Sequence, residues 1–230
     1  VEDGEYILDA ANQEKYWESS TTFKENTDKI LYLTFDDGPS QVTNAILDIL
    51  KDKGVKATFF VVGYKIKGRK DIILRIKNEG HSIGLHSYTH NYKKVYSSQK
   101  TFLAEMDKTF KEIKGITGLS VYTIRFPGGS INRLNKALLN SIHKNNYRIY
   151  DWNACLSDGI NGDIPPNQLY EESTKVVGNY SRIILLMHCA ENNNNTCKAL
   201  GRIIDYYANK SYEFKTIDEN TPEYIFKIRK

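Results

Sequence analysis

Short, continuously apolar runs alternate with amphipathic segments from residue 30 to the C-terminal end of the chain. The runs have the length of β-strands and cover residues 31–35, 57–62, 81–85, 121–125, 147–152, 182–188 and 213–217. Between them apolar residues recur every three or four positions, which predicts helices over residues 42–50, 71–77, 102–113, 134–142, 168–177 and 200–207. Apolar strands that alternate with helices are typical of a parallel sheet buried on both faces. The pattern predicts an α/β fold, either a barrel or an open doubly wound sheet.

Residues 1–29 differ from this pattern because they are polar, mixed in charge and without sustained periodicity. We interpret them as an N-terminal extension or linker, in which residues 6–8 have the character of a short strand. The remainder, residues 30–230, is long enough for one domain with a full core.

Charge and hydropathy narrow the choice of partner. The 32 basic residues exceed the 28 acidic ones only slightly and form no dense block, so we expect no nucleic-acid partner. The net charge of +4 suits an anionic surface such as a cell envelope. No apolar run approaches the roughly 20 residues needed to cross a bilayer, and no signal-type segment begins the sequence. We therefore expect no transmembrane segment in this chain, and a monomer.

Three cysteines, Cys155, Cys189 and Cys197, leave the pairing open. Cys189 is close enough to Cys197 to bridge a short loop, but a Cys155–Cys189 disulfide or three thiols are equally compatible with the sequence. No CxxC spacing indicates a cysteine metal site.

Polar clusters follow several of the predicted strands. Asp36 and Asp37 end the first strand before Gly38 and Pro39. Adjacent carboxylates repel each other, so a site that keeps both usually gives them different roles, one on a cation and one in proton transfer. The alternative is an ordinary turn followed by a helix N-cap.

His86 and His90 follow the third strand, four residues apart. If they lie on one helical turn, both imidazoles face the same way and reach one cation, although a chance pair at this spacing is common. With Asp37 they would form a His/His/Asp site with open positions for water and substrate. Asp36 would then remain to accept a proton.

Arg125 ends the fourth strand and precedes a Pro127-Gly128-Gly129 turn. An arginine there can pair with Asp36, and the turn can present its backbone N–H groups to an oxyanion, unless it is a plain surface turn. The fifth strand brings Asp151 and Trp152, and Asp158 follows a few residues later. Trp152 could wall a pocket or stack on a sugar, or be an ordinary core residue.

His188 closes the sixth apolar strand, after Leu186. A histidine in this position is often a core residue with satisfied hydrogen bonds. Opposite an activated water it would instead be well placed as a general acid near neutral pH.

These clusters together resemble a known family. TFDDG at 34–38, HSYTH at 86–90, RFPG at 125–128 and LMH at 186–188 are similar, in this order, to the motifs of the NodB-type polysaccharide deacetylases, carbohydrate esterase family 4. The resemblance implies a distorted (β/α) barrel with fewer than eight complete repeats. It also implies metal-dependent removal of N-acetyl or O-acetyl groups from polysaccharides.

The resemblance assigns a role to each motif residue. Asp36 matches the catalytic base and Arg125 the residue that tethers it. Asp37, His86 and His90 match the metal ligands, for Zn²⁺ or for Co²⁺ or another divalent ion.

Other matches concern the substrate. The Gly128 amide matches the oxyanion donor and His188 the general acid, while Trp152 and Leu186 would line the acetyl-methyl pocket. We also expect Tyr88, inside the second motif, to contact substrate.

The fourth motif departs from the family pattern. Cys155 stands where the family commonly has an aspartate that holds the catalytic histidine, so Asp151 or Asp158 would have to replace it. Cys189 stands where an aspartate often follows the last histidine. A Cys155–Cys189 disulfide would account for both departures.

The resemblance leads to an expected function. We expect a bacterial, secreted or membrane-anchored enzyme that deacetylates N-acetylglucosamine residues of peptidoglycan, or of another N-acetylated polysaccharide, and releases acetate. Its location would be extracellular or at the cell envelope, with any anchor absent from this chain. The alternatives are a carbohydrate esterase for O-acetyl xylan or chitin-type substrates, and a catalytically weak glycan-binding module.

Overall fold

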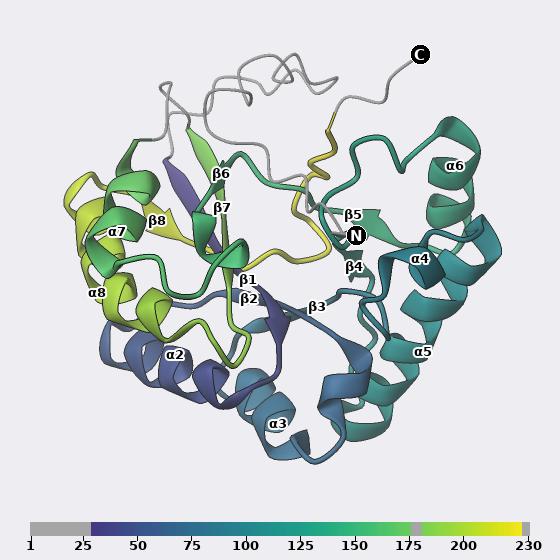
Figure 1. The fold of residues 1–230 in the computed structure, drawn as a ribbon, viewed down its shortest axis with the longest axis horizontal. Helices are drawn as coiled ribbons and strands as arrows, with labels where there is room; N and C mark the ends of the chain where they lie inside the picture. The colour runs from purple at the N-terminus through teal and green to yellow at the C-terminus, as the bar shows by residue number, and fades with distance from the viewer. Residues whose placement is uncertain (1–28, 176–180, 227–230) are drawn as a thin grey trace.

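The computed structural model describes residues 29–175 and 181–226, which form a curled parallel sheet surrounded by helices (Figure 1). The central strand β1 (Ile30–Gly38) pairs with β2 (Thr58–Val61) on one side and with β7 (Arg182–His188) on the other. The shorter strands are β3 (Ser82–Leu85), β4 (Thr123–Ile124), β5 (Arg148–Ile149), β6 (Ala154–Cys155) and β8 (Glu213–Phe214). Their order is β5-β4-β3-β2-β1-β7-β6, with β8 beside β1.

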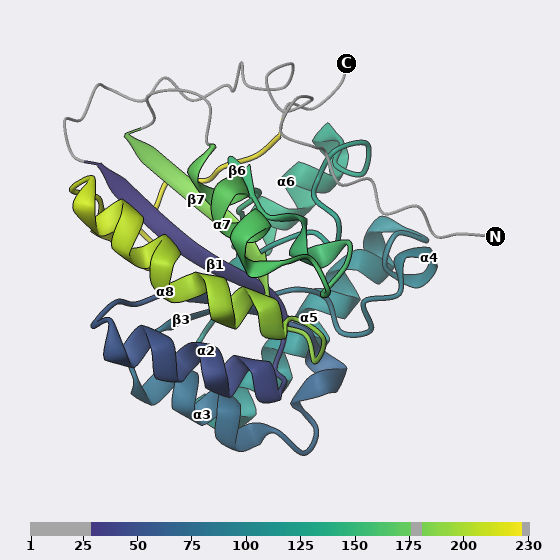
Figure 2. The same cartoon turned by 60° about the vertical axis from the view of Figure 1, so that its left-hand side comes forward.

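The helices wrap the outer side of this sheet. Figure 2 shows α8, α2 and α3 side by side on the outside of the curl. The helices are α2 (Gln41–Asp52), α3 (Lys70–Asn78), α4 (Tyr92–Val95), α5 (Gln99–Thr117), α6 (Lys136–Lys144), α7 (Pro166–Thr174) and α8 (Asn194–Asn209), with 3₁₀ turns η2 (Gly63–Ile66) and η3 (Ser157–Gly159). The predicted α/β fold with an incomplete barrel is confirmed.

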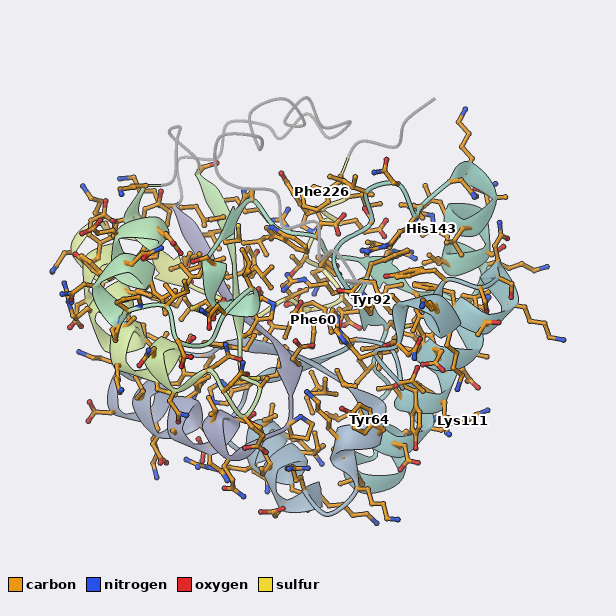
Figure 3. The ribbon with its side chains drawn as sticks, in the orientation of Figure 1. Phe60, Tyr64, Tyr92, Lys111, His143 and Phe226 are labelled. Carbon is orange, nitrogen blue, oxygen red and sulfur yellow. The ribbon has the colours of Figure 1, made fainter. Side chains whose placement is uncertain are left out.

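The alternation of side chains along β1 separates two cores. Leu31, Leu33 and Phe35 belong to the large cluster between the sheet and the helices. Tyr32 belongs to a smaller cluster on the opposite face, with Phe60 among its members. Figure 3 places Phe60 near the middle of the view, inside the ring of helices. Because successive side chains on a strand alternate between faces, Thr34 and Asp36 follow Tyr32 into this inner space.

The predicted strands all occur, but β4, β5 and β8 keep only two residues each of their longer predicted runs. The pattern of apolar residues predicted neither β6, α4 nor the two 3₁₀ turns. The predicted strand at 6–8 lies outside the described residues, and the proposed boundary at residues 29 and 30 stays a prediction. In the described ranges, no helix is both long enough and apolar enough to cross a bilayer.

The suggested Cys155–Cys189 disulfide does not form. All three cysteines are described and none forms a disulfide. Cys155 pairs in register with Leu186, three residues before Cys189. Three residues along a strand span about 10 Å, which is beyond the roughly 7 Å that a disulfide can bridge between Cα atoms. The buried Cys189 thiol instead donates to the backbone oxygen of Asp36 at 3.2 Å.

Candidate active site

The end of β1 brings its two neighbouring carboxylates, Asp36 and Asp37, to one cavity. Asp36 is still in register with His188 of β7. The pairing with β2 then shifts between Asp36 and Gly38, and Asp37 takes a left-handed conformation with φ 69°. Lys65 of η2 donates to the Asp37 backbone oxygen at 2.8 Å and holds this turn. A regular strand would place these neighbouring side chains on opposite faces, but the bulge lets both of them reach the same cavity.

Asp36 is only 2% exposed and forms an ion pair with Arg125, which is fully buried. Arg125 Nη1 lies 2.9 Å from Asp36 Oδ1 and donates to Thr34 Oγ1 at 2.7 Å. Its Nε donates to the Tyr150 backbone oxygen at 2.7 Å, and its guanidinium lies 4.2 Å from the centre of the Phe60 ring. This network fixes the orientation of the Asp36 carboxylate.

Asp37, His86 and His90 converge at the mouth of the curl. Their ligand atoms all lie within 4.8 Å of one another. Asp37 Oδ1 lies 3.1 Å from His90 Nε2 and 3.7 Å from His86 Nε2. The same Oδ1 atom is buried and accepts no hydrogen bond from any described residue. A buried carboxylate oxygen left in this state, facing two imidazoles, fits a divalent cation.

The protonation of the three groups also suits a cation. His86 Nδ1 lies 2.9 Å from the Arg125 backbone oxygen, which can only accept, so Nε2 presents its lone pair to the site. Burial lowers the pKa of His90 to about 4, although Asp37 opposes it, so this imidazole is neutral at pH 7. Burial would raise the pKa of Asp37, but His90 and His86 outweigh it and lower that pKa to about 2.

The segment from His86 to His90 is not the helical turn that the spacing suggested. Ser87 and His90 have positive φ angles, 61° and 52°, which a right-handed helix excludes. Buried Glu105 of α5 accepts hydrogen bonds from the Thr89 backbone N–H at 2.6 Å and from Thr89 Oγ1 at 2.9 Å. The two imidazole rings still lie 5.1 Å apart, brought together by a bend instead of a helix.

His188 is held by Asp158, which resolves the choice between Asp151 and Asp158. His188 Nδ1 lies 2.9 Å from Asp158 Oδ1, and the His188 backbone N–H donates to Asp158 Oδ2 at 2.9 Å. Thr196 Oγ1 also donates to Oδ2, at 2.8 Å. Burial would lower the pKa of His188, but the Asp158 carboxylate outweighs burial and raises it to about 9. The imidazole is therefore protonated at neutral pH.

Asp151 has a different environment. Its carboxylate accepts hydrogen bonds from the backbone N–H groups of Ser130 at 3.0 Å and Phe226 at 2.9 Å, and from the Ser130 hydroxyl. Burial raises its pKa to about 6, although these hydrogen bonds oppose the shift. Asp151 thus ties the turn after Gly129 to the C-terminal segment, and its carboxylate does not reach His188.

Tyr88 also lies away from the predicted site. Lys108 Nζ sits 3.6 Å from the centre of its ring, and a side chain at Gly63 would collide with that ring. Tyr88 is not among the residues that line the cavity at the strand ends. The Tyr88 backbone N–H donates to Glu105 Oε2 at 3.0 Å and so helps to hold the bend between the two histidines.

The remaining site residues surround one cavity of about 40 Å³. A single water needs about 10–15 Å³ of such space, so the cavity takes a small group of a few heavy atoms. Its walls are formed by Asp36, Asp37, His86, His90, His188, Gly128, Trp152 and Leu186.

Three wall residues were missed by the sequence analysis: Tyr92, Leu156 and Gly159. A side chain at Gly159 would lie 2.3 Å from the His188 ring, so only glycine allows this approach. Gly159 directly follows Asp158, a position that could have drawn attention to it. Tyr92 is two residues beyond His90, and its ring meets the His90 ring edge-on at 5.5 Å. Nothing in the spacing marks Tyr92.

Comparison with known proteins agrees with this geometry. A family model described as polysaccharide deacetylase matches residues 23–150, which is more than half of the chain. The chain belongs to the polysaccharide deacetylase family. The match includes the strand ends that carry Asp36, Asp37, His86, His90 and Arg125.

Individual members of the family are similar over most of the chain. A peptidoglycan-N-acetylglucosamine deacetylase of Bacillus cereus is 32% identical over 84% of this chain and 71% of its own length. The crystal structure of the catalytic domain of a peptidoglycan N-acetylglucosamine deacetylase from Eubacterium rectale has a TM-score of 0.82 and 27% identity, covering 93% of this chain and 99% of that one. The Xyl-CE4 domain of a multidomain xylanase from the hindgut metagenome of Trinervitermes trinervoides has a TM-score of 0.72 and 31% identity, covering 83% and 88%.

Proposed function

We propose that this protein is a metal-dependent polysaccharide deacetylase that removes N-acetyl groups from N-acetylglucosamine residues of peptidoglycan and releases acetate. One observation carries the proposal: a single small cavity joins the Asp36–Arg125 pair, the Asp37, His86 and His90 cluster, and a protonated His188. The Bacillus cereus and Eubacterium rectale relatives, which are named for this substrate, support the choice of glycan.

The cation is proposed to be Zn²⁺, bound by Asp37, His86 and His90. Two imidazoles and one carboxylate are a common zinc donor set, and Co²⁺ or another divalent ion would also suit these ligands. When bound, the ion would polarise the acetyl carbonyl and lower the pKa of a nearby water.

Asp36 is proposed as the general base. Its Oδ1 is taken by Arg125, while its Oδ2 lies 3.6 Å from His86 Nε2, on the side of the cation site. A carboxylate held in this way can accept the proton of the attacking water without changing its orientation. Arg125 is a positioning residue in this scheme, since its donors are directed to Asp36, Thr34 and backbone oxygens.

His188 is proposed as the general acid and the Gly128 backbone N–H as an oxyanion donor. His188 can pass its proton to the departing nitrogen, and Asp158 stabilises the protonated ring that it starts from. Gly128, which also lines the cavity, would donate to the oxygen that gains charge. Trp152 and Leu186, both nearly buried, would enclose the acetyl methyl group.

A peptidoglycan substrate places the protein outside the cytoplasmic membrane, secreted or attached to the envelope, and we expect it to work as a monomer. The reaction is tested by measuring acetate release from peptidoglycan, chitooligosaccharides and acetylxylan, with purified protein supplied with Zn²⁺ or Co²⁺. Asp36→Asn should lower kcat by at least about two orders of magnitude, the usual contribution of a general base. Full activity in metal-loaded Asp36→Asn protein would contradict this assignment.

The xylanase-associated relative supports a second candidate, an esterase that acts on O-acetyl xylan with the same residues. Acetate release from acetylxylan that exceeds release from both N-acetylated polymers would favour this candidate. Glycan binding without acetate release from any polymer would instead indicate a binding module. The Asp158–His188 pair argues against that outcome, because Asp158 holds the catalytic histidine in place of the aspartate that Cys155 replaces.

A further inference from the structure

The turn that carries Gly128 is held by few backbone hydrogen bonds of its own. Gly128 and Gly129 both have positive φ angles, 68° and 80°, and the Gly129 N–H donates to the Phe126 backbone oxygen at 2.8 Å. Two consecutive glycines lose much conformational entropy on folding, so such a turn needs outside contacts to keep one geometry. The direction of the Gly128 N–H depends on that geometry.

Arg133 supplies these contacts from just beyond the turn. Its Nη1 donates to the Pro127 backbone oxygen at 2.5 Å and to the Gly129 backbone oxygen at 2.9 Å. The Pro127 carbonyl belongs to the same peptide group as the Gly128 N–H, and the Gly129 carbonyl belongs to the peptide group that follows Gly129. The Arg133 backbone N–H also donates to the Ser130 backbone oxygen at 3.1 Å, which closes a turn between the two residues. One guanidinium thus bridges both ends of the Gly128 segment.

Two tyrosines hold the guanidinium in place. Its central carbon lies 4.8 Å from the centre of the Tyr92 ring and 4.7 Å from that of Tyr96. The Tyr96 hydroxyl donates to the same Pro127 oxygen at 2.7 Å. Figure 3 shows Tyr92, which comes from α4, close to the middle of the molecule. An arginine stacked on aromatic rings loses little further freedom when it forms hydrogen bonds, so its fork is preorganised.

Gly128 fits closely against this group. A Cβ atom at Gly128 would lie 2.6 Å from Arg133 Nη1 and 2.9 Å from the Tyr92 hydroxyl oxygen. Arg133 therefore packs directly on the Cα of a residue that lines the cavity, and it brings a positive charge to that wall. Losing this contact would free the turn and remove the nearby charge together.

We propose that Arg133 is the positioning residue for the Gly128 N–H. Its hydrogen bonds to the Pro127 and Gly129 carbonyls fix the geometry of the turn and so align the oxyanion donor. The inference rests on the proposed function, which gives the Gly128 amide that role. Removal of one oxyanion donor costs about 10²–10³ in kcat, and a donor that is present but loose should cost less, about 10–100-fold. Because alignment matters most when charge develops, kcat should fall while KM changes little.

The competing explanation is that Arg133 has only a structural role, in which its packing against Tyr92 and Tyr96 stabilises the fold. In that case its loss would lower the melting temperature and leave kcat unchanged. Arg148 offers a matched control, because it is an exposed arginine whose Nη1 also donates to a backbone oxygen, that of Tyr147 at 3.0 Å. Arg148 does not line the cavity.

The experiment compares Arg133→Met, Arg133→Lys and Arg148→Met with the unaltered full chain, all loaded with Zn²⁺. The readouts are kcat and KM for acetate release from chitooligosaccharides, zinc content, and hydrogen exchange of the Gly129 N–H. We expect Arg133→Met to lose 10–100-fold in kcat, with KM within about twofold, unchanged zinc content and faster exchange at Gly129. Arg133→Lys should recover only part of kcat, and Arg148→Met should match the unaltered protein.

Unchanged kcat or unchanged Gly129 exchange in folded Arg133→Met protein would overturn the proposal. If Arg133→Met does not fold, Tyr96→Phe tests the same turn by removing one hydrogen bond to Pro127 while keeping the ring. It should lower kcat about two- to tenfold, and no loss would count against the proposal. If the unaltered protein releases no acetate, the proposed function fails on its own, and Gly129 exchange alone decides whether Arg133 holds the turn.

Discussion

His188 and Asp158 contact each other twice, through the imidazole Nδ1 to Oδ1 and through the His188 backbone N–H to Oδ2, both at 2.9 Å. The carboxylate belongs to η3, which follows β6, while the histidine ends β7. Asn193 Nδ2 donates to the Asp158 backbone oxygen at 2.8 Å and fixes the aspartate in turn. Both the charge and the direction of the imidazole therefore depend on a residue three positions after the cysteine of the altered motif.

The first prediction concerns the pH dependence of Asp158→Asn. The asparagine keeps the shape of the carboxylate but loses its charge, so the pKa of His188 should fall from about 9. Because the proposed general acid must be protonated, the alkaline limb of the kcat profile should move to lower pH, and kcat at pH 7 should fall about 10²-fold. Acetate release measured from pH 5 to 10 checks this. An unchanged alkaline limb would contradict the assigned role of Asp158.

The same pair should affect stability in the metal-free protein. The pKa of His188 is raised in the folded state to about 9 from an ordinary value of 6.5. A raised pKa stabilises the fold below the ordinary value, and this contribution is lost as pH rises from about 6.5 through 9. The difference in unfolding free energy between unaltered and Asp158→Asn proteins should therefore shrink over this interval. Urea unfolding of chelator-treated proteins at several pH values measures it, and a constant difference would argue against the linkage.

The second prediction concerns Gly159→Ala. The added methyl group would lie 2.3 Å from His188 Cε1 and 2.6 Å from Nε2, so the ring must move away from the cavity. We expect kcat to fall more than about tenfold, and the free energy of unfolding to fall by about 1–3 kcal/mol from overpacking. Gly115→Ala is the control, because nothing lies within 4 Å of a side chain at that helical position. It should leave kcat unchanged and stabilise slightly.

The parallel sheet and the gathering of polar residues at one edge could be predicted from the sequence. Continuous apolar runs between helical patterns indicate parallel strands, and the carboxyl ends of parallel strands meet on one side. Each of four site residues ends or directly follows such a run: Asp36, His86, Arg125 and His188. Whether they lie close together therefore depended only on the order of the strands in the sheet. The boundaries were less predictable, because β4 and β5 pair over only two residues each.

Two local errors have physical causes that lie far away in the sequence. The 86–90 segment was considered as a helical turn, because spacing alone cannot show that Ser87 and His90 take positive φ angles or that Glu105, on α5, binds the backbone N–H groups of the bend. The Cys155–Cys189 disulfide failed because the strand register, which places Cys155 beside Leu186, is not encoded in the cysteine spacing. The Asp151 and Asp158 alternatives could be separated only by the fold around η3.

The third prediction separates the neighbouring carboxylates by metal content. Asp37→Asn should lower Zn²⁺ affinity by at least about tenfold, because the amide oxygen is neutral and a weaker ligand than the carboxylate. Asp36→Asn, the same change one residue earlier, should retain zinc, since Asp36 Oδ1 is engaged by Arg125. Elemental analysis after dialysis, and competition with a chromophoric chelator, distinguish the two variants. Equal zinc loss in both would contradict the separate roles.

The last prediction concerns Glu105, which holds the bend between the two histidines. Its Oε2 accepts hydrogen bonds from the backbone N–H groups of Tyr88 at 3.0 Å and Thr89 at 2.6 Å, and Oε1 lies 3.3 Å from Lys94 Nζ. Glu105→Gln removes the charge and turns one acceptor into a donor that faces the lysine. Residues that orient metal ligands commonly cost 10–100-fold in metal affinity when changed, and we expect zinc affinity to fall by about that factor.

The free energy of unfolding of metal-free Glu105→Gln should also fall, by about 1–3 kcal/mol, because buried N–H groups lose a charged acceptor. Glu112→Gln makes the same change at an exposed position of the same helix, α5, and should alter neither zinc affinity nor stability. Chelator competition gives the affinity, and urea unfolding gives the stability. If Glu105→Gln lost stability but bound zinc normally, Glu105 would support the helix packing without shaping the ligand geometry, and the convergence of His86 and His90 would have to arise from Ser87 and the β3 register alone.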